Sequence, residues 1–412
     1  MIRPAGITRL AAIGATTAVL WLSPAVAGDQ TTPGATAESV VAIAKRLNPT
    51  VAAAALDFDA AVHKVGTAGV LADPTLILAA WDVNSLGVGQ RRFGFEQEFK
   101  LWGKYGLERN IALADADAAK FQGRAIVTEL IAQVVAAHGE YTAAYEAVAI
   151  SLEIKRQYDE ILGLVRSRYG ATSVDRQDVI RAELEAATAE GDVVRRQGEQ
   201  KSAAARLNAL IGRPSLAPLA APTGFRAVRA ISLAQALARS ANPMLALAGA
   251  QTNSAAQTKS LTDLNYYPDL TLGATYVQRP GTEDTGEFMA GFKVPLHYEV
   301  KDAEQRAAGA RLGAAQVRAE ALRLRIDGQI AGAWFGVEAL PRIVQIYVSR
   351  QLPPARACVD NAKNGFQPGS TDLFFVFEAE RRLRAVQLDL LKLKVEPQTK
   401  YAERERLAGG SL

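Results

Sequence analysis

Hydrophobic and polar residues alternate in three short segments of the chain, at 92–100, 270–277 and 288–294, and a fourth segment, 75–81, is also strand-like. Successive side chains of a strand point to opposite faces, so this alternation predicts strands with one apolar and one polar face. Segment 75–81 is apolar on both faces. Segments of about 9 or 10 residues of this kind are typical of strands in outer-membrane barrels. The apolar faces are predicted to contain Phe93, Phe95, Phe99, Leu270, Leu272, Tyr276, Phe288 and Phe292.

Most of the remaining chain has helical spacing. Residues 38–47 and 50–72 are predicted to form two helices that meet at Asn48-Pro49, since Asn can cap a helix and Pro can open one. Residues 104–168 lack proline and predict a helix of roughly 100 Å, which needs a partner along its length. A 4-3-4-3-4 spacing, typical of a coiled-coil seam, is formed by Leu130, Val134, Ala137, Tyr141, Ala144 and Val148.

Turn signals divide these segments. The turn at 168–173 is predicted to precede a second long helix, capped by Ser173 or Asp175, that ends at 212–214. The polar, glycine-containing stretches 82–91 and 279–287 are expected to be hairpin loops. Another long helix is predicted from about 299 to 365, with interruptions caused by Pro341, Pro353 and Pro354.

The chain contains an internal duplication. Asn48-Pro49 recurs as Asn242-Pro243, at an offset of 194 (242 − 48), and Pro74 and Pro268 have the same offset. Tyr169-x-x-Thr172-x-x-Asp175 recurs as Phe366-x-x-Gly369-x-x-Asp372, at an offset of 197 (366 − 169). A repeat of this length indicates two equivalent halves. The expected organisation is a first repeat at 28–211, a linker at 212–230 that holds three prolines, and a second repeat at 231–412.

Residues 1–27 have the pattern of a secretory signal peptide. Arg3 and Arg9 precede the apolar stretch 10–22, and Ala25-Val26-Ala27 fits a small-x-small cleavage pattern. Loss of these two arginines would lower the formal net charge from +4 to +2, so no strongly basic surface indicates nucleic-acid binding. The single cysteine, Cys358, excludes an intrachain disulfide.

The predicted strands require more than one chain. Four strands cannot close a barrel, and open sheet edges are not tolerated in lipid. Three chains would supply twelve strands, an even and closable number. The alternative from the strands alone is a small soluble sheet packed on a helix.

No group of residues predicts catalysis or metal binding. His63, His138 and His297 are dispersed, and none has a second ligand three or four residues away. Acidic pairs such as Asp115/Asp117 lie on solvated helix faces, and Gly87-Val88-Gly89 precedes a strand rather than a helix, unlike a nucleotide-binding loop. We therefore expect no enzyme activity and no cofactor.

The order of these features resembles the TolC-type outer-membrane efflux factors. The resemblance rests on the duplication, the Asn-Pro helix starts, Pro268-Asp269-Leu270 at the third strand, and Leu207-Asn208-x-Leu210-x-Gly212-Arg213 at the end of the first half. Leu352-Pro353-x-Ala355 is similar to the heavy-metal efflux (CzcC/CusC-like) branch. The resemblance covers nearly all of residues 38–408.

This resemblance implies a mostly α fold with a small β part. A homotrimer would form a twelve-stranded barrel in outer-membrane lipid above a periplasmic α-barrel of duplicated long helical hairpins. Its partners would be a periplasmic adaptor (membrane fusion) protein and an inner-membrane pump, of the RND type. The expected cargo is heavy-metal cations; the alternatives are organic drugs, or a different role as a periplasmic coiled-coil adaptor or scaffold.

The resemblance also assigns a periplasmic tip, where the two turns would contact the adaptor. Its members are Arg168, Tyr169, Thr172, Asp175, Asp178, Phe366, Gly369 and Asp372. The family pattern at such a turn is Tyr-x-x-Gly, so Thr172 departs from it and Gly369 keeps it. Asp175 and Asp372 have two interpretations. They cap the returning helices, or, with Asp178 and Arg168, they form ion pairs and a cation-attracting constriction that close the mouth.

Overall fold

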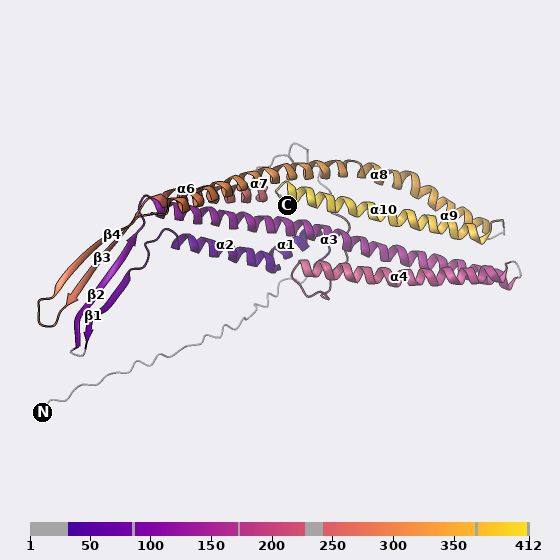
Figure 1. Ribbon diagram of the computed structural model, residues 1–412. Helices are drawn as coiled ribbons and strands as arrows, with labels where there is room; N and C mark the ends of the chain where they lie inside the picture. The colour runs from indigo at the N-terminus through magenta and orange to yellow at the C-terminus, as the bar shows by residue number, and fades with distance from the viewer. Residues whose placement is uncertain (1–31, 85–86, 172–173, 227–241, 367–369, 410–412) are drawn as a thin grey trace, which may run out of the picture.

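The computed structural model describes residues 32–84, 87–171, 174–226, 242–366 and 370–409. The chain is elongated, with a four-stranded sheet at one end and two long helical hairpins that extend away from it (Figure 1). The predicted signal peptide, 1–27, lies outside the described residues.

From α2 in the first half and α6 in the second, the described residues of the two halves follow the same order of elements. The first half consists of α1 (Ala37–Leu47), α2 (Pro49–Thr67), β1 (Thr75–Asn84), β2 (Gly87–Phe99), α3 (Lys104–Gly170) and α4 (Arg176–Leu210). The described part of the second half consists of α6 (Pro243–Asp263), η2 (Leu264–Tyr266), β3 (Asp269–Gln278), β4 (Thr285–Lys293), α7 (Tyr298–Glu338), α8 (Leu340–Ile346), η3 (Tyr347–Gln351), α9 (Leu352–Phe366) and α10 (Leu373–Leu407).

The two offsets of the duplication place an insertion in the long helical segment of the second half, which corresponds to α3 of the first half. The starts of β1 and α3 recur at the smaller offset as the starts of β3 and α7, whereas the end of α4 recurs at the larger offset as the end of α10. Because Tyr169 already corresponds to Phe366 at the larger offset, the additional residues lie in α7–α9. This path contains a break at Ala339 and the π-helical turn η3, a conformation that accommodates extra residues within a helix. The interruptions expected at Pro341, Pro353 and Pro354 therefore occur.

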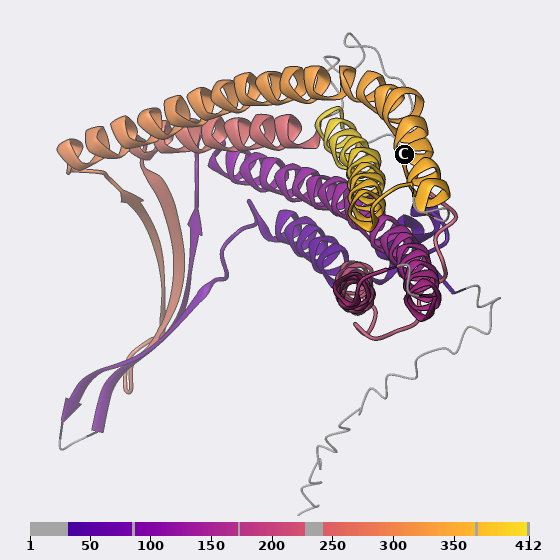
Figure 2. The same ribbon diagram turned by 90° about the vertical axis from the view of Figure 1, so that its right-hand side faces the viewer.

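The sheet is antiparallel, with the strand order β1-β2-β3-β4 (Figure 2). The strands are longer than predicted, since β1 reaches Asn84, β2 begins at Gly87 and β4 begins at Thr285. The prediction of hairpin loops was therefore wrong for most of 82–91 and for the end of 279–287. Trp81 pairs with Gln90 and Val83 with Val88. Backbone pairing therefore continues into the two stretches that were expected to be loops, which their composition did not indicate.

Helix α2 ends at Thr67, earlier than the predicted end at position 72. Gly69 has φ +68, and a Cβ at this position would lie 2.2 Å from the Tyr105 carbonyl oxygen. The chain therefore turns beside the start of α3, with a backbone conformation that favours glycine.

The two largest apolar clusters among the described residues hold the helices together. The first joins α1, α3, α4 and α10 near the middle of the molecule, and Leu130, Val134, Ala137 and Tyr141 of the predicted seam are buried in it. The second joins the two hairpins near their tips. The long helices are thus stabilised by burial along their length rather than by propensity alone.

Candidate functional site

The sheet has one continuous apolar face. Its register places Phe93 between Leu78 and Tyr276, and Phe95 between Leu76 and Ala274, which in turn pairs with Phe288. Polar exceptions are Arg91 and Gln278, which pair near the loop end of the sheet, and Gln97, whose amide donates a hydrogen bond to the Ala72 carbonyl oxygen at 2.7 Å. All eight residues predicted to share the apolar face lie on it: Phe93, Phe95, Phe99, Leu270, Leu272, Tyr276, Phe288 and Phe292.

The opposite face carries charge. Arg92 lies 3.3 Å from the Glu287 carboxylate, and its guanidinium is 5.2 Å from the centre of the Trp81 ring. This face is also crowded, because a Cβ at Gly94 would lie 2.5 Å from Thr275 Oγ1. Crowding of side chains is expected on the concave side of a curved sheet. The polar face therefore fits the inside of a closed barrel, and the apolar face fits its outside.

The two hairpins meet at the end of the molecule opposite the sheet (Figure 1). Phe366 is only 4% exposed and packs in the second apolar cluster, whereas Tyr169 is 46% exposed. The expectation that Phe366 is a surface contact is wrong in this respect: its side chain supports the tip. Thr172 and Gly369 lie outside the described residues.

Arg168 connects the two tips. Its guanidinium lies 4.7 Å from the centre of the Phe366 ring, and its Nη1 donates a hydrogen bond to the Phe366 carbonyl oxygen. The contacts that the structure describes for Arg168 do not include the expected ion pair with a tip carboxylate. The Phe366 ring and the Phe366 carbonyl oxygen thus orient the guanidinium of Arg168. Through these contacts Arg168 connects the turn of the first hairpin to the turn of the second within one chain.

Three carboxylates lie at the starts of the returning helices. Asp372 caps α10, and its Oδ1 accepts a hydrogen bond from the Phe374 N–H at 2.7 Å. Asp175 occupies the equivalent position of α4 but makes no such side-chain bond. Burial, together with the negative charges of Asp372 and Asp175, raises the pKa of Asp178, and Arg181 partly opposes this. Capping thus accounts for Asp372 but not for the other two.

The raised pKa of Asp178 predicts a pH-dependent stability. Asp178 ionises less readily in the folded chain than in the unfolded chain. Its contribution to the free energy of unfolding is therefore most favourable below the ordinary pKa of 3.8, and it is lost as the pH rises through the raised pKa. Asp178→Asn should therefore raise the thermal midpoint of the detergent-solubilised protein at neutral pH, with no gain below about pH 3.8. Asp117→Asn, an exposed position on α3, is the control. A lower midpoint for Asp178→Asn at neutral pH would contradict this electrostatic account.

Asn48 and Asn242 each join two helix ends. The Oδ1 of Asn48 accepts a hydrogen bond from the Thr50 N–H at 2.8 Å, and its Nδ2 donates one to the Leu210 carbonyl oxygen at 2.7 Å. Asn242 repeats both bonds, with the Met244 N–H at 2.9 Å and the Leu407 carbonyl oxygen at 2.7 Å. One amide thus satisfies an unpaired donor at one helix start and an unpaired acceptor at another helix end.

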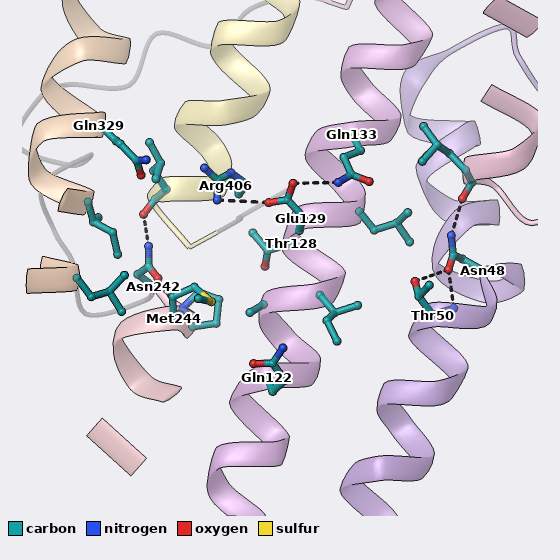
Figure 3. Close-up of a pocket in the computed structure, with 18 of the residues that line it drawn as sticks. Asn48, Thr50, Gln122, Thr128, Glu129, Gln133, Asn242, Met244, Gln329 and Arg406 are labelled. Carbon is teal, nitrogen blue, oxygen red and sulfur yellow. Dashed lines mark hydrogen bonds and ion pairs between the residues drawn. The ribbon is translucent and has the colours of Figure 1, made fainter. Parts of the chain in front are cut away.

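The two asparagines lie on opposite sides of a groove of about 890 Å³, with α3 between them (Figure 3). Glu129 of α3 lies 3.3 Å from Arg406 of α10 and accepts a hydrogen bond from Gln133 at 3.0 Å. The groove therefore marks the junction between the two repeats, and its polar contacts tie one repeat to the other.

The motif at 207–213 also has a structural explanation within this chain. Asn208 is fully buried, and its Nδ2 donates hydrogen bonds to the carbonyl oxygens of Ser215 and Ala217. Gly212 has φ +73, and a Cβ there would lie 2.6 Å from the Leu47 carbonyl oxygen. The motif thus turns the chain closely past the α1–α2 junction.

The described residues contain no group of three or more His, Cys, Asp and Glu side chains that could hold a metal ion. Within the same ranges, no helix combines the length and apolarity needed to cross a membrane. His138 is buried, with its Nε2 3.0 Å from the Gly34 carbonyl oxygen, and burial lowers its pKa.

Comparison with known proteins gives a family and a fold. Residues 40–213 match the family model described as "Outer membrane efflux protein". The structure is similar over 91% of the chain to CusC (92% of that chain, TM-score 0.79, 17% identity), to VceC of Vibrio cholerae (96%, 0.78, 19%) and to the open state of MtrE of Neisseria gonorrhoeae (89%, 0.79, 18%). No curated protein sequence gives a significant match.

The match to the outer membrane efflux protein model covers residues 40–213, which is less than half of the chain. The family model covers the first repeat, and the structural similarity extends the same fold through the second.

The structure shows contacts of three polar residues, Asn48, Asn242 and Asp269, that the sequence did not predict. Asn48 and Asn242 were predicted as caps, but their second hydrogen bonds, to the carbonyl oxygens of Leu210 and Leu407, were not. The duplication could have indicated these bonds, because Leu210 and Leu407 end equivalent helices. Asp269 was part of the Pro268-Asp269-Leu270 motif, but no role was predicted for it. This carboxylate accepts hydrogen bonds from Lys104 Nζ at 2.9 Å and from the Leu101 N–H at 3.1 Å, and thereby connects β3 to the start of α3.

Proposed function

We propose that three copies of this chain form one continuous duct across the outer membrane and into the periplasm. The observation that supports this most is the four-stranded sheet, whose face is apolar and whose strands β1 and β4 each have an edge without a partner strand among the described residues. Unpaired edges are not tolerated in lipid, and three sheets of four strands give a closed barrel of twelve. Each copy contributes two structural repeats, 28–211 and 231–412, joined by the linker 212–230.

In this proposal the duct works with a periplasmic adaptor and an inner-membrane pump of the RND type. The exposed parts of the two tips, Tyr169 among them, form the surface that the adaptor contacts. Thr172 and Gly369 belong to the same proposed surface.

The cargo that we propose is heavy-metal cations. The support is the local resemblance of Leu352-Pro353-x-Ala355 to the heavy-metal branch. TM-scores from 0.77 to 0.79 do not separate that branch from other members, so organic drugs are the second candidate. A strain that lacks this gene should become sensitive to heavy-metal cations and recover when the gene is restored. Sensitivity to organic drugs alone would favour the second candidate.

The tip carboxylates are proposed to line the closed periplasmic mouth and to attract cations. Threefold symmetry would bring Asp175, Asp178 and Asp372 of each copy towards one axis, where like charges raise the local negative potential. Within one chain, Asp372 and Asp175 lie close enough to Asp178 for their negative charges to add to burial in raising its pKa.

The combined variant Asp175→Asn/Asp372→Asn tests this role. Asparagine can replace Asp372 as a cap, so the helix starts are retained while two charges per chain are removed. Single-channel recording in planar bilayers should show altered conductance and weaker cation selectivity. The control is Asp117→Asn, which removes a charge away from the tip. Unchanged selectivity in a stable double variant would leave the carboxylates with a capping role only.

A further inference from the structure

A cluster of polar and aromatic side chains lies on the polar face of the sheet, towards the end opposite the helices (Figure 1). Arg92 of β2 is at its centre. Its guanidinium is 5.2 Å from the centre of the Trp81 ring on β1, and its Nη1 is 3.3 Å from Glu287 Oε2 on β4. Its Nη2 lies 3.5 Å from Gln90 Oε1. One cation thus connects side chains from three strands of the sheet.

The ion pair of this cluster crosses the remaining strand, β3. Arg92 pairs in the register with Val277 of β3. Glu287 pairs with Thr275, two residues earlier on the same strand, so the contact between the two charges passes over β3. Val277 has 0% of its surface exposed, and it is the only buried residue among the sheet residues whose burial the structure describes. The Arg92 side chain therefore lies along the sheet and covers it.

Arg92 differs in charge from the rest of this face. Over the paired strand residues, the face carries the carboxylates of Glu96, Glu98, Asp269 and Glu287 and the cations Arg92 and Lys293. Lys293 is opposite Asp269 at the helix end of the sheet. Arg92 is therefore the only cation of the paired strand residues on the remainder of the face. Three copies would form a mainly negative inner wall with three Arg92 side chains near its outer end.

The contacts of Arg92 hold its charge in one place. An aromatic ring and a carboxylate both attract a guanidinium, and together they orient it. Trp81 is 57% exposed, so the cluster borders the space enclosed by the proposed barrel. In a water-filled pore, charges fixed on the wall decide which ions are concentrated there. A positive charge on an otherwise negative wall lowers the local concentration of cations.

We propose that Trp81, Arg92 and Glu287 form an ion-selectivity site near the outer end of the barrel. Arg92 is the positive charge that small permeating ions meet, Glu287 partly offsets it, and Trp81 is a positioning residue that holds the guanidinium on the wall. Cations that the carboxylates further inside attract are thus held less strongly at the exit. The inference rests on the proposed closed barrel.

Reversal potentials in planar bilayers test the site, with a gradient of potassium chloride across the bilayer. Arg92→Gln should move the reversal potential towards the equilibrium potential of potassium, because the wall loses its positive charge. Glu287→Gln should move it in the opposite direction. The matched control is Arg91→Gln. Arg91 carries the same charge but lies on the apolar face, so its removal should leave the reversal potential unchanged.

The charges at the tip are separated from those of the barrel by a second set of measurements. Each variant is also recorded in the Asp175→Asn/Asp372→Asn background, in which the proposed mouth carries less charge. The shift caused by Arg92→Gln should be larger there, because the barrel then contributes more of the selectivity. No shift in either background, or equal shifts for Arg91→Gln and Arg92→Gln, would overturn the site.

Trp81→Phe and Trp81→Ala test the positioning role. Phenylalanine keeps an aromatic face for the guanidinium, whereas alanine allows Arg92 to extend from the wall into the lumen. Trp81→Ala should therefore lower the single-channel conductance and move the reversal potential away from that of potassium, and Trp81→Phe should match the unmodified chain. Unchanged conductance and reversal potential in Trp81→Ala would overturn the role of Trp81. If trimers of the unmodified chain conducted no ions, the proposed duct itself would be contradicted, so the two failures are distinguishable.

Discussion

Phe288→Arg should abolish insertion of the assembled protein into membranes. Phe288 is 91% exposed on the apolar face, in the same row as Leu76, Phe95 and Ala274, near the middle of the strands. A lipid-facing arginine near the bilayer midplane destabilises a barrel by about 2–4 kcal/mol, and a trimer would carry this change three times. The fraction of trimer in purified outer membranes measures the effect. Phe95→Arg should act in the same way.

Met289→Arg is the matched control for this experiment. Met289 is the next residue of β4 but lies on the opposite, polar face, opposite Gly273. There the long cation would face water inside the barrel rather than lipid, so trimer insertion should be largely retained. If both arginine variants insert equally well, the assignment of the two faces is wrong.

Asn48→Ala should destabilise the helical part of the chain by more than the loss of an ordinary cap. Loss of an N-cap costs about 1 kcal/mol, and an unsatisfied buried carbonyl group costs about a further 1–3 kcal/mol. Asn48 is 7% exposed, so water cannot readily replace its bond to the Leu210 carbonyl oxygen. The thermal midpoint of the detergent-solubilised protein should fall, and Asn242→Ala should give a similar fall in the second repeat.

Thr36→Ala provides the comparison for the asparagine variants. Thr36 caps α1 by accepting a hydrogen bond from the Ser39 N–H at 3.3 Å, but it is exposed and its side chain joins no second helix. Its loss should therefore cost only about 1 kcal/mol. Equal shifts for Thr36→Ala and Asn48→Ala would show that the bond to Leu210 contributes nothing measurable.

The fold could be predicted because its signals are periodic and repeated. Alternation predicted β2, β3 and β4 and placed residues such as Phe93 and Phe288 on apolar faces, since a strand places every second residue on the same side. The segment that forms β1 is apolar on both faces, so alternation did not predict it. The two offsets of the duplication matched the elements of one half to those of the other. The loop boundaries could not be predicted in the same way, because pairing between strands extends through polar residues such as Gln90, whose partner in space the sequence does not state.

Less of the candidate site could be predicted. The positions of Arg168 and Phe366 in two corresponding turns suggested a shared tip. They did not indicate that the guanidinium of Arg168 stacks on the ring of Phe366. Asp175 and Asp372 look equivalent in sequence, yet only Asp372 accepts a capping hydrogen bond. Such differences depend on side-chain rotamers and on contacts between segments that lie far apart in the chain, which no local pattern encodes.

The most direct test of the duct is the mass and architecture of the complex extracted from outer membranes. Native mass spectrometry in detergent should give three copies of the chain, and electron cryomicroscopy of the same sample in nanodiscs should show one barrel of twelve strands above a helical tunnel. A single copy in the soluble periplasmic fraction, or a sheet that remains open in the membrane, would contradict the account.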